Sequence, residues 1–222
     1  MDPQKALVIF SGGQDSTTCL GWAKNRYPQV EALSIDYGQK HRVELTQAAK
    51  IARRLGVAHH VLEAEFFGRM VKSALTHPGD VGGAHQDHPG LPASFVPNRN
   101  AFFLTLAHAW AQTAGAGVLV MGVSQTDYSG YPDCREEFIT AMGRALNLGA
   151  EVDIVMEAPL LHLTKAQTFA LAQKEGVLAE VLELSHTCYN GVETMNPWGR
   201  GCGDCPACGL RRKGWEEYTA AL

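Results

Sequence analysis

The stretch Phe10-Ser11-Gly12-Gly13-Gln14-Asp15-Ser16 follows an apolar run at residues 5–9 and leads into a helix-like segment at residues 17–23. We expect a strand, a tight turn and a helix, because two adjacent glycines allow the backbone to turn sharply. The start of the helix then presents unpaired N–H groups and the positive end of the helix dipole. This arrangement predicts a phosphate-binding turn.

The side chains of the turn favour phosphate binding over a purely structural role. Ser11 and Ser16 add hydroxyl donors, and the carboxylate of Asp15 is compatible with phosphate if Mg²⁺ bridges the two. The lysine that ends a Walker A loop is absent, and the spacing is not the G-x-G-x-x-G of nicotinamide-binding folds. Neither a GTPase-like site nor a nicotinamide site is therefore predicted.

The composition indicates a globular protein whose partners are small molecules. The chain has 222 residues, of which 45% are hydrophobic and 19% charged, enough for one α/β domain and a small module. Its net charge of -4 gives no general attraction to nucleic acid or to an anionic membrane. No signal peptide or apolar run of membrane-spanning length is apparent, so we expect a cytoplasmic protein without membrane or nucleic-acid partners.

Strands and helices alternate through the first third of the chain. A strand at residues 30–35 ends at Asp36-Tyr37-Gly38, a helix with 3.6-residue apolar periodicity covers residues 43–55, and a short strand follows at residues 60–62. This order predicts an α/β fold with a Rossmann-like, doubly wound parallel sheet. Ligands of such sheets bind at the carboxyl ends of the strands, where the glycine turn and residues 36–38 both lie.

The same alternation continues in the second half of the chain. We expect a helix at residues 98–114 with His108 in the core, a buried strand at 117–122, and a polar loop at 123–135 that holds substrate. A helix at 136–148, a strand at 152–156 and a helix that ends at Gly176 should follow. Thr164 and Gln167 have the spacing of a capping box for that last helix.

Residues 76–97 lose periodicity and are rich in proline, glycine and histidine. A loop of this length in a compact domain is uncommon unless it is functional, so we expect a lid over the active site. His77, His85, Asp87 and His88 could be imagined as metal ligands, but a solvated loop is favoured over a metal site.

Four of the six cysteines predict a metal site near the end of the chain. Cys202, Cys205 and Cys208 have C-x₂-C-x₂-C spacing, and Cys188 supplies the fourth thiolate of a tetrahedral, structural zinc site. An iron–sulfur cluster is possible only if Cys188 completes it, and unbound cysteines are the remaining alternative. We accordingly divide the chain into a nucleotide-binding domain, residues 1–184, and a zinc-binding region with a helix, residues 185–222. Cys19 and Cys134 are expected to have structural or substrate-contact roles.

Several blocks together resemble the 7-cyano-7-deazaguanine synthase family of the queuosine pathway, which is part of the PP-loop, or N-type ATP pyrophosphatase, superfamily. The blocks, found between residues 5 and 213, are F-S-G-G-Q-D-S-T-T-C-L, D-Y-G-Q, F-V-P-N-R-N, T-D-Y-S-G-Y-P-D-C-R, the Thr164-Lys165-Ala166-Gln167 step and T-C-Y-N-G with C-G-D-C-P-A-C. The resemblance implies the adenine nucleotide alpha hydrolase-like fold. It also implies conversion of 7-carboxy-7-deazaguanine and ammonia to the nitrile with ATP and Mg²⁺, by a homodimer with one structural Zn²⁺ per chain.

On this resemblance we expect specific roles for three groups of residues. Asp15, Arg99 and Lys165 are the expected catalytic residues: Asp15 helps to hold Mg²⁺, and the two cations face phosphate or the substrate carboxylate. The expected ATP-binding residues are Phe10, Ser11, Gly12, Gly13, Gln14, Asp15, Ser16, Asp36, Tyr37 and Gly38. The expected substrate-binding residues are Asn100, Asp127, Tyr131, Asp133 and Arg135, with Tyr128 or Tyr131 stacking on the base.

The chain departs from the family pattern at a few positions, and one other function was weighed. Ser124-Gln125 replaces a frequent Cys-Glu, and Asn98 replaces a frequent glycine. A PP-loop tRNA thiolase with an iron–sulfur or zinc site is the alternative. The acidic net charge counts against it, because only Arg211-Arg212-Lys213 is basic, and such a triplet usually caps a helix or is solvated.

Overall fold

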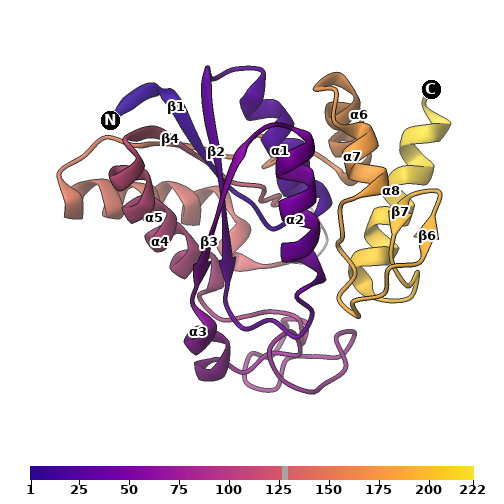
Figure 1. Cartoon of the computed structure of the whole chain (residues 1–222). Helices are drawn as coiled ribbons and strands as arrows, with labels where there is room; N and C mark the ends of the chain where they lie inside the picture. Colours follow the sequence, from indigo (N-terminus) through magenta and orange to yellow (C-terminus); the bar gives the residue numbers. More distant parts are fainter. Residues whose placement is uncertain (127–129) are drawn as a thin grey trace.

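The computed structural model describes residues 1–126 and 130–222 and has a parallel sheet with helices on both faces (Figure 1). Its elements are β1 (Asp2–Ile9), α1 (Gln14–Lys24), β2 (Gln29–Asp36), α2 (Val43–Arg54), β3 (Ala58–Glu63), α3 (Glu65–Met70), α4 (Arg99–Ala114), β4 (Ala116–Val120), the 3₁₀ helix η1 (Pro132–Cys134), α5 (Glu136–Ala150), β5 (Val155–Glu157), α6 (Lys165–Lys174), α7 (Leu178–Glu183), β6 (Met195–Asn196), β7 (Gly199–Arg200) and α8 (Pro206–Ala220).

The five-stranded sheet has the order β3-β2-β1-β4-β5, and all of its pairs are parallel. β1 is central, and its side chains alternate between two cores: Ala6 and Val8 pack toward α1 and α2, whereas Leu7 packs toward α4 and α5. The strand order reverses between β1 and β4, so a crevice opens at their carboxyl ends. The prediction of a Rossmann-like, doubly wound sheet is confirmed.

The elements that were predicted agree with the structure apart from their ends, whereas the helices α3 and α7 and the two-residue strands β6 and β7 were not predicted. β1 begins earlier than predicted, at Asp2, and β5 is shorter, covering only Val155–Glu157. His108 is buried in the core with its Nε2 3.0 Å from Asn147 Oδ1, as predicted. The capping box is also confirmed, because Thr164 Oγ1 accepts from Gln167 N–H while the Gln167 side chain accepts from Thr164 N–H.

The C-terminal elements lie together at one end of the sheet, where α8 packs beside α6 (Figure 1). The two helices approach closely at Gly214, because a Cβ there would lie 2.6 Å from the Cβ and Cγ of Lys165. This close packing fixes the stem of Lys165 at the start of α6.

Residues 71–98 form a long loop between α3 and α4 without helix or strand of its own. Part of it covers the cysteine-rich region, since Ala74 and Val81 pack against Cys188, Trp198 and Cys205. His85 is buried rather than solvated, with Nε2 3.1 Å from the Lys72 carbonyl oxygen. The lid function of this loop remains a prediction.

Among the residues that the structure describes, no helix combines the length and apolar character required to traverse a bilayer.

Candidate functional site

The glycine turn between β1 and α1 has a conformation that a residue with a side chain would adopt only with strain. Gly12 has a φ of +80°, and a Cβ there would lie 2.6 Å from the Glu44 carbonyl oxygen and 2.7 Å from Ala48 N. The turn therefore packs directly on the first half of α2. No side chain caps the start of α1, where Gly13 is the N-cap residue. Of the N–H groups at this end, that of Gln14 donates to Thr187 Oγ1 at 3.4 Å, whereas those of Asp15 and Ser16 can serve a ligand.

The two serines of the turn pair with each other inside it. Ser11 Oγ and Ser16 Oγ are 3.1 Å apart, and Ser11 N–H donates to Ser16 Oγ at 3.2 Å. Gly13 N–H donates to Ser11 Oγ at 3.3 Å. These hydrogen bonds within the turn stabilise its conformation.

Gly12→Ala should destabilise the protein by about 3 kcal/mol, because it adds a left-handed alanine and a clash with the α2 backbone. A control is Gly149→Ala in α5, where a Cβ meets nothing within 4 Å. Thermal melts of both variants test this expectation. A melting temperature of Gly12→Ala equal to that of the wild type would contradict it.

A cavity of about 260 Å³ lies at the carboxyl ends of β1 and β4. It brings together most of the residues that the sequence analysis singled out: Ser11, Gly13, Gln14, Asp15, Ser16, Tyr37, Arg99, Asn100, Tyr131 and Lys165. These residues come from five separate parts of the chain, which meet at the edge of the sheet where β4 lies beside β1.

Asp15 and Lys165 form an ion pair at the mouth of the turn. Lys165 Nζ lies 3.0 Å from Asp15 Oδ1 and 2.9 Å from Asp15 Oδ2, and both side chains are partly exposed. The ammonium therefore lies beside the glycine turn and pairs with the carboxylate that was predicted to approach Mg²⁺.

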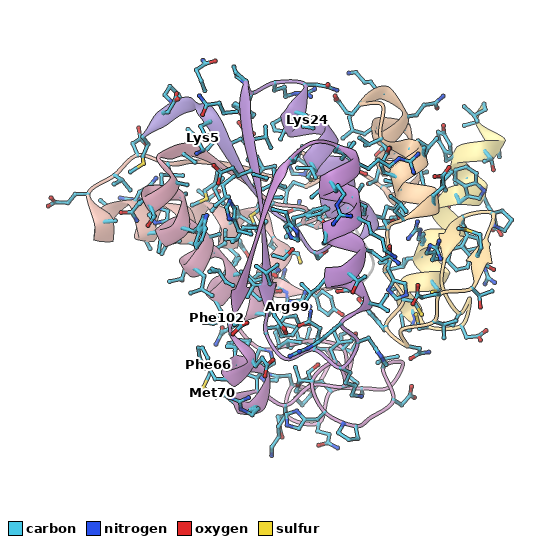
Figure 2. The ribbon with its side chains drawn as sticks, viewed as in Figure 1. Lys5, Lys24, Phe66, Met70, Arg99 and Phe102 are labelled. Atoms are coloured by element: carbon cyan, nitrogen blue, oxygen red, sulfur yellow. The ribbon has the colours of Figure 1, made fainter. Side chains whose placement is uncertain are left out.

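Arg99 is the second cation of the cavity and lies at the start of α4, at the carboxyl end of the sheet (Figure 2). Burial lowers its pKa, but the nearby Tyr37 and Asp133 raise it, and the net shift is upward. Its Nε has no hydrogen-bond partner in the described part of the chain. A buried donor without a partner is costly, so an anion in the cavity would satisfy it.

The backbone before Arg99 explains one departure from the family pattern. Asn98 has a φ of +58° and a ψ of 16°, which is the left-handed region. Asparagine and glycine are the residues that adopt this conformation most readily. Asn98 therefore preserves the turn that a glycine would form.

Some predicted ATP-binding residues support the cavity without lining it. Phe10 is buried beneath the turn. Asp36 accepts a hydrogen bond from Gly38 N–H at 3.2 Å and lies 3.2 Å from Arg42. The contacts of Asp36 stabilise the turn after β2, and Tyr37 is the residue of that turn that lines the cavity.

The predicted substrate residues fall into four groups, of which three are described first. Asn100 and Tyr131 line the cavity, and Tyr131 Oη is 2.7 Å from Ser94 Oγ of the long loop. Asp133 is buried outside it, where its Oδ2 accepts from Asn100 N–H at 3.2 Å. Asp127, like Tyr128, lies outside the described residues.

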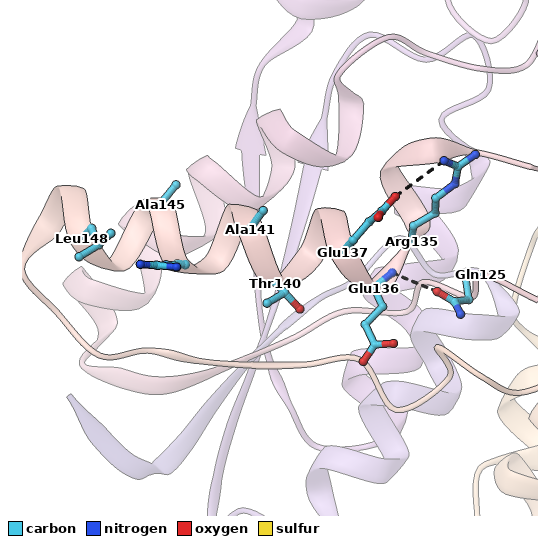
Figure 3. A pocket seen from close by; sticks show the side chains of 9 residues that line it. Gln125, Arg135, Glu136, Glu137, Thr140, Ala141, Ala145 and Leu148 are labelled. Carbon is cyan, nitrogen blue, oxygen red and sulfur yellow. Dashed lines mark hydrogen bonds and ion pairs between the residues drawn. The ribbon is translucent and has the colours of Figure 1, made fainter.

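Arg135 does not line this cavity. It belongs to a broad depression over the exposed face of α5, where its guanidinium is 3.9 Å from the carboxylate of Glu137 (Figure 3). Gln125 lines the same depression and accepts from Glu136 N–H at 3.1 Å. Ser124, the other residue of that departure, lines the cavity.

Among the polar residues that line the cavity, the sequence analysis missed Glu44, His186, Thr187, Tyr189 and Arg211. Burial raises the pKa of Glu44 to about 7, although Arg99 opposes the shift. Burial likewise raises the pKa of Tyr189. These side chains are visible in the sequence, but no local pattern indicates which of them would face the cavity.

Arg211 corrects a specific expectation. The basic triplet was expected to cap a helix end or to be solvated, yet Arg211 is only 1% exposed, whereas Arg212 and Lys213 are exposed. The three residues lie inside α8, so its helical period turns one of them toward the protein and two toward solvent.

The four predicted metal cysteines meet in a single cluster. The Sγ atoms of Cys188, Cys202, Cys205 and Cys208 all lie within 4.8 Å of one another, and those of Cys202 and Cys208 are 3.9 Å apart. A tetrahedral zinc site with Zn–S bonds of about 2.3 Å requires sulfur separations of about 3.8 Å, so the donor set fits. Hydrogen bonds from Cys205 and Cys208 lower the pKa of Cys188, and the same contacts raise the pKa values of Cys205 and Cys208. The cluster could therefore hold a metal ion.

Comparisons of the sequence with a family model and with known proteins point to the same family. The family model described as "Queuosine biosynthesis protein QueC" matches residues 5–219. A 7-cyano-7-deazaguanine synthase of Wolinella succinogenes is 57% identical over 220 residues, covering 98% of this chain and 94% of the relative. A 7-cyano-7-deazaguanine synthase of Caulobacter sp. is 49% identical over 231 residues, covering 97% and 91% of the two chains.

Among solved structures, the fold is similar to that of a 4-thiouridine synthetase determined with RNA and bound ATP. The TM-score is 0.54 at 14% identity, and the match covers 97% of this chain and 50% of the other. At this identity the similarity concerns the fold alone.

Proposed function

The chain belongs to the QueC family of queuosine biosynthesis, and on that premise we propose that it is a 7-cyano-7-deazaguanine synthase. Its substrates are 7-carboxy-7-deazaguanine, ammonia and ATP. The observation that carries the proposal is the meeting, in one cavity, of the glycine turn with Lys165 and Arg99. That arrangement suits a nucleotide whose phosphates are attacked by a bound carboxylate.

The reaction requires two activations of oxygen. A carboxylate is inert to ammonia, so its oxygen attacks the α-phosphorus of ATP and displaces pyrophosphate. Ammonia then attacks the acyl carbon, and AMP leaves to give the amide. The amide oxygen displaces pyrophosphate from a second ATP, and loss of AMP with a proton gives the nitrile. Positioning and charge neutralisation supply most of the catalysis in such transfers.

The cavity residues supply these two effects. The start of α1, with Ser11 and Ser16, binds the phosphates, and Asp15 helps to hold Mg²⁺ as it approaches with ATP. Lys165 and Arg99 then neutralise charge on phosphate or on the substrate carboxylate. The ion pair of Lys165 with Asp15 supports this role, because it keeps the ammonium beside the turn.

The deazaguanine base is proposed to occupy the part of the cavity near Asn100 and Tyr131. Asn100 offers hydrogen bonds to the base edge and Tyr131 an aromatic face, while Asp133 fixes the backbone of Asn100. Asp127 is retained as a proposed contact. Arg135 is the weakest of the proposed contacts, because it lies on the outer face of α5. Free ammonia is the proposed nitrogen source.

The cysteine cluster is proposed to hold one structural Zn²⁺ per chain, and the protein to act as a cytoplasmic homodimer on the free base rather than on nucleic acid. Two observations support a structural role for the metal. The cluster offers four sulfur donors, and the described segment between Cys188 and Cys202 contains only the two-residue strands β6 and β7. The tRNA thiolase alternative lacks the exposed basic triplet that it would use, since Arg211 is buried.

The function is tested by following AMP and pyrophosphate with 7-carboxy-7-deazaguanine, ammonium and Mg²⁺-ATP. We expect nitrile formation with two pyrophosphates released per product, and no nitrile when either the acid or ammonium is omitted. Sulfur transfer to tRNA without nitrile formation would instead support the thiolase.

A further inference from the structure

The segment before the first metal cysteine lies directly on the glycine turn. His186 N–H donates to the Gly12 carbonyl oxygen at 3.0 Å, and Gln14 N–H donates to Thr187 Oγ1 at 3.4 Å. The tail therefore contacts the phosphate-binding turn through the two residues that immediately precede Cys188.

Arg211 holds this segment from the other side. Its guanidinium donates to Thr187 Oγ1 at 3.1 Å, to Trp198 O at 2.8 Å and to Val181 O at 2.6 Å. No carboxylate lies within ion-pair distance of it in residues 1–126 and 130–222. The guanidinium instead donates hydrogen bonds to neutral oxygens, and Arg211 lines the cavity.

The hydrogen bonds of Thr187 leave one group available. A hydroxyl has two acceptor lone pairs and one proton to donate. Gln14 N–H and Arg211 occupy the lone pairs, and the described residues offer the proton no acceptor. The proton can therefore be donated toward the cavity, which Thr187 lines next to Gly13 and Gln14.

We propose that Thr187 donates its hydroxyl proton to a phosphate oxygen of bound ATP, and that Arg211 is the positioning residue that orients this hydroxyl. The metal-binding tail is then part of the nucleotide site rather than only a separate structural element. This inference rests on the proposed function, because it assumes that ATP binds in the cavity.

Calorimetric titration of the metal-loaded, full-length protein with Mg²⁺-ATP, without the acid substrate, tests the inference. Thr187→Val should raise the Kd for ATP about 10-fold, the effect of losing one hydrogen bond to a charged group. Thr187→Ser should bind ATP with nearly wild-type affinity, because it keeps the hydroxyl. Thr113→Val, at an exposed position of α4, is the matched control. If Thr187→Val does not retain its metal, Thr187→Ala with full metal content replaces it.

The role of Arg211 is tested by combining substitutions. Arg211→Lys should weaken ATP binding in the wild-type background but have little further effect in Thr187→Val, because Arg211 acts through that hydroxyl. Arg212→Lys is the exposed control and should leave binding unchanged. A purely structural Arg211 would lower the melting temperature equally in both backgrounds without this dependence of the Kd.

The outcomes separate the inference from the proposed function. Wild-type ATP affinity in folded Thr187→Val overturns the inference and leaves the synthase function standing. A wild-type protein that binds no Mg²⁺-ATP overturns both.

Discussion

Replacement of Asp15 by asparagine is expected to lower the rate of pyrophosphate release by about 10³-fold, because the variant loses the carboxylate proposed to hold Mg²⁺ at the phosphates. The fold should survive the change. The Asp15–Lys165 pair is partly exposed, with side-chain exposures of 26% and 12%, and pairs of this kind contribute about 1 kcal/mol or less. Initial rates of pyrophosphate release at saturating acid and ammonium provide the measurement.

The control is Asp153→Asn, an exposed aspartate before β5 that lies outside the cavity. Its rate should equal that of the wild type. The melting temperature of Asp15→Asn should change by no more than about 4 °C, given the small energy of the pair. Wild-type turnover in Asp15→Asn would refute the metal–phosphate role, and a large loss of stability would show that the ion pair is chiefly structural.

Cys205→Ser is expected to lower the melting temperature by about 10 °C or more and to release the metal. The free energy of metal binding is also free energy of folding in such sites, and for structural zinc in peptides it amounts to about 10–16 kcal/mol. Loss of several kcal/mol shifts the melting of a chain of this length by about 2–4 °C for each kcal/mol. The segment between Cys188 and Cys202 has little else to order it, because its strands, β6 and β7, have two residues each.

The matched control is Cys19→Ser, the same substitution at a buried cysteine outside the cluster. It should retain one metal per chain by elemental analysis. In Cys205→Ser, the kcat per folded molecule should change less than the free energy of unfolding does. The Kd for ATP should rise if the tail completes the nucleotide site. A fully folded, metal-free variant that loses only kcat would show that the metal takes part in the chemistry.

The fold and the glycine turn could be predicted from the sequence because their signals are local. The apolar run of β1, two glycines and a helix start are adjacent, and the three cysteines of C-x₂-C-x₂-C lie within seven positions. The capping box at Thr164 and Gln167 was also a local signal, whereas Lys165 and Arg99 were singled out only through the resemblance to the family. Which residues lie next to Lys165 and Arg99 could not be predicted from local patterns.

The partners depend on contacts between distant parts of the chain. Asp15 and Lys165 are 150 residues apart and meet only because β4 lies beside β1 and α8 presses on α6 at Gly214. Arg135 was expected to contact substrate because it follows the polar loop, but the start of α5 places it on the outer face. Glu44 and Tyr189 reach the cavity because α2 and the tail both pack against the glycine turn.

The sequence by itself determined the class of fold, through apolar periodicity, and it singled out the glycine turn and the clustered cysteines, through the spacing of residues within short segments. Only the tertiary structure decided which cations line the cavity and that Thr187 and Arg211 join the tail to the turn. The physical reason is that burial is a property of the whole packed chain. The same basic triplet contains one side chain in the interior and two in solvent, and only the docking of α8 decides between them.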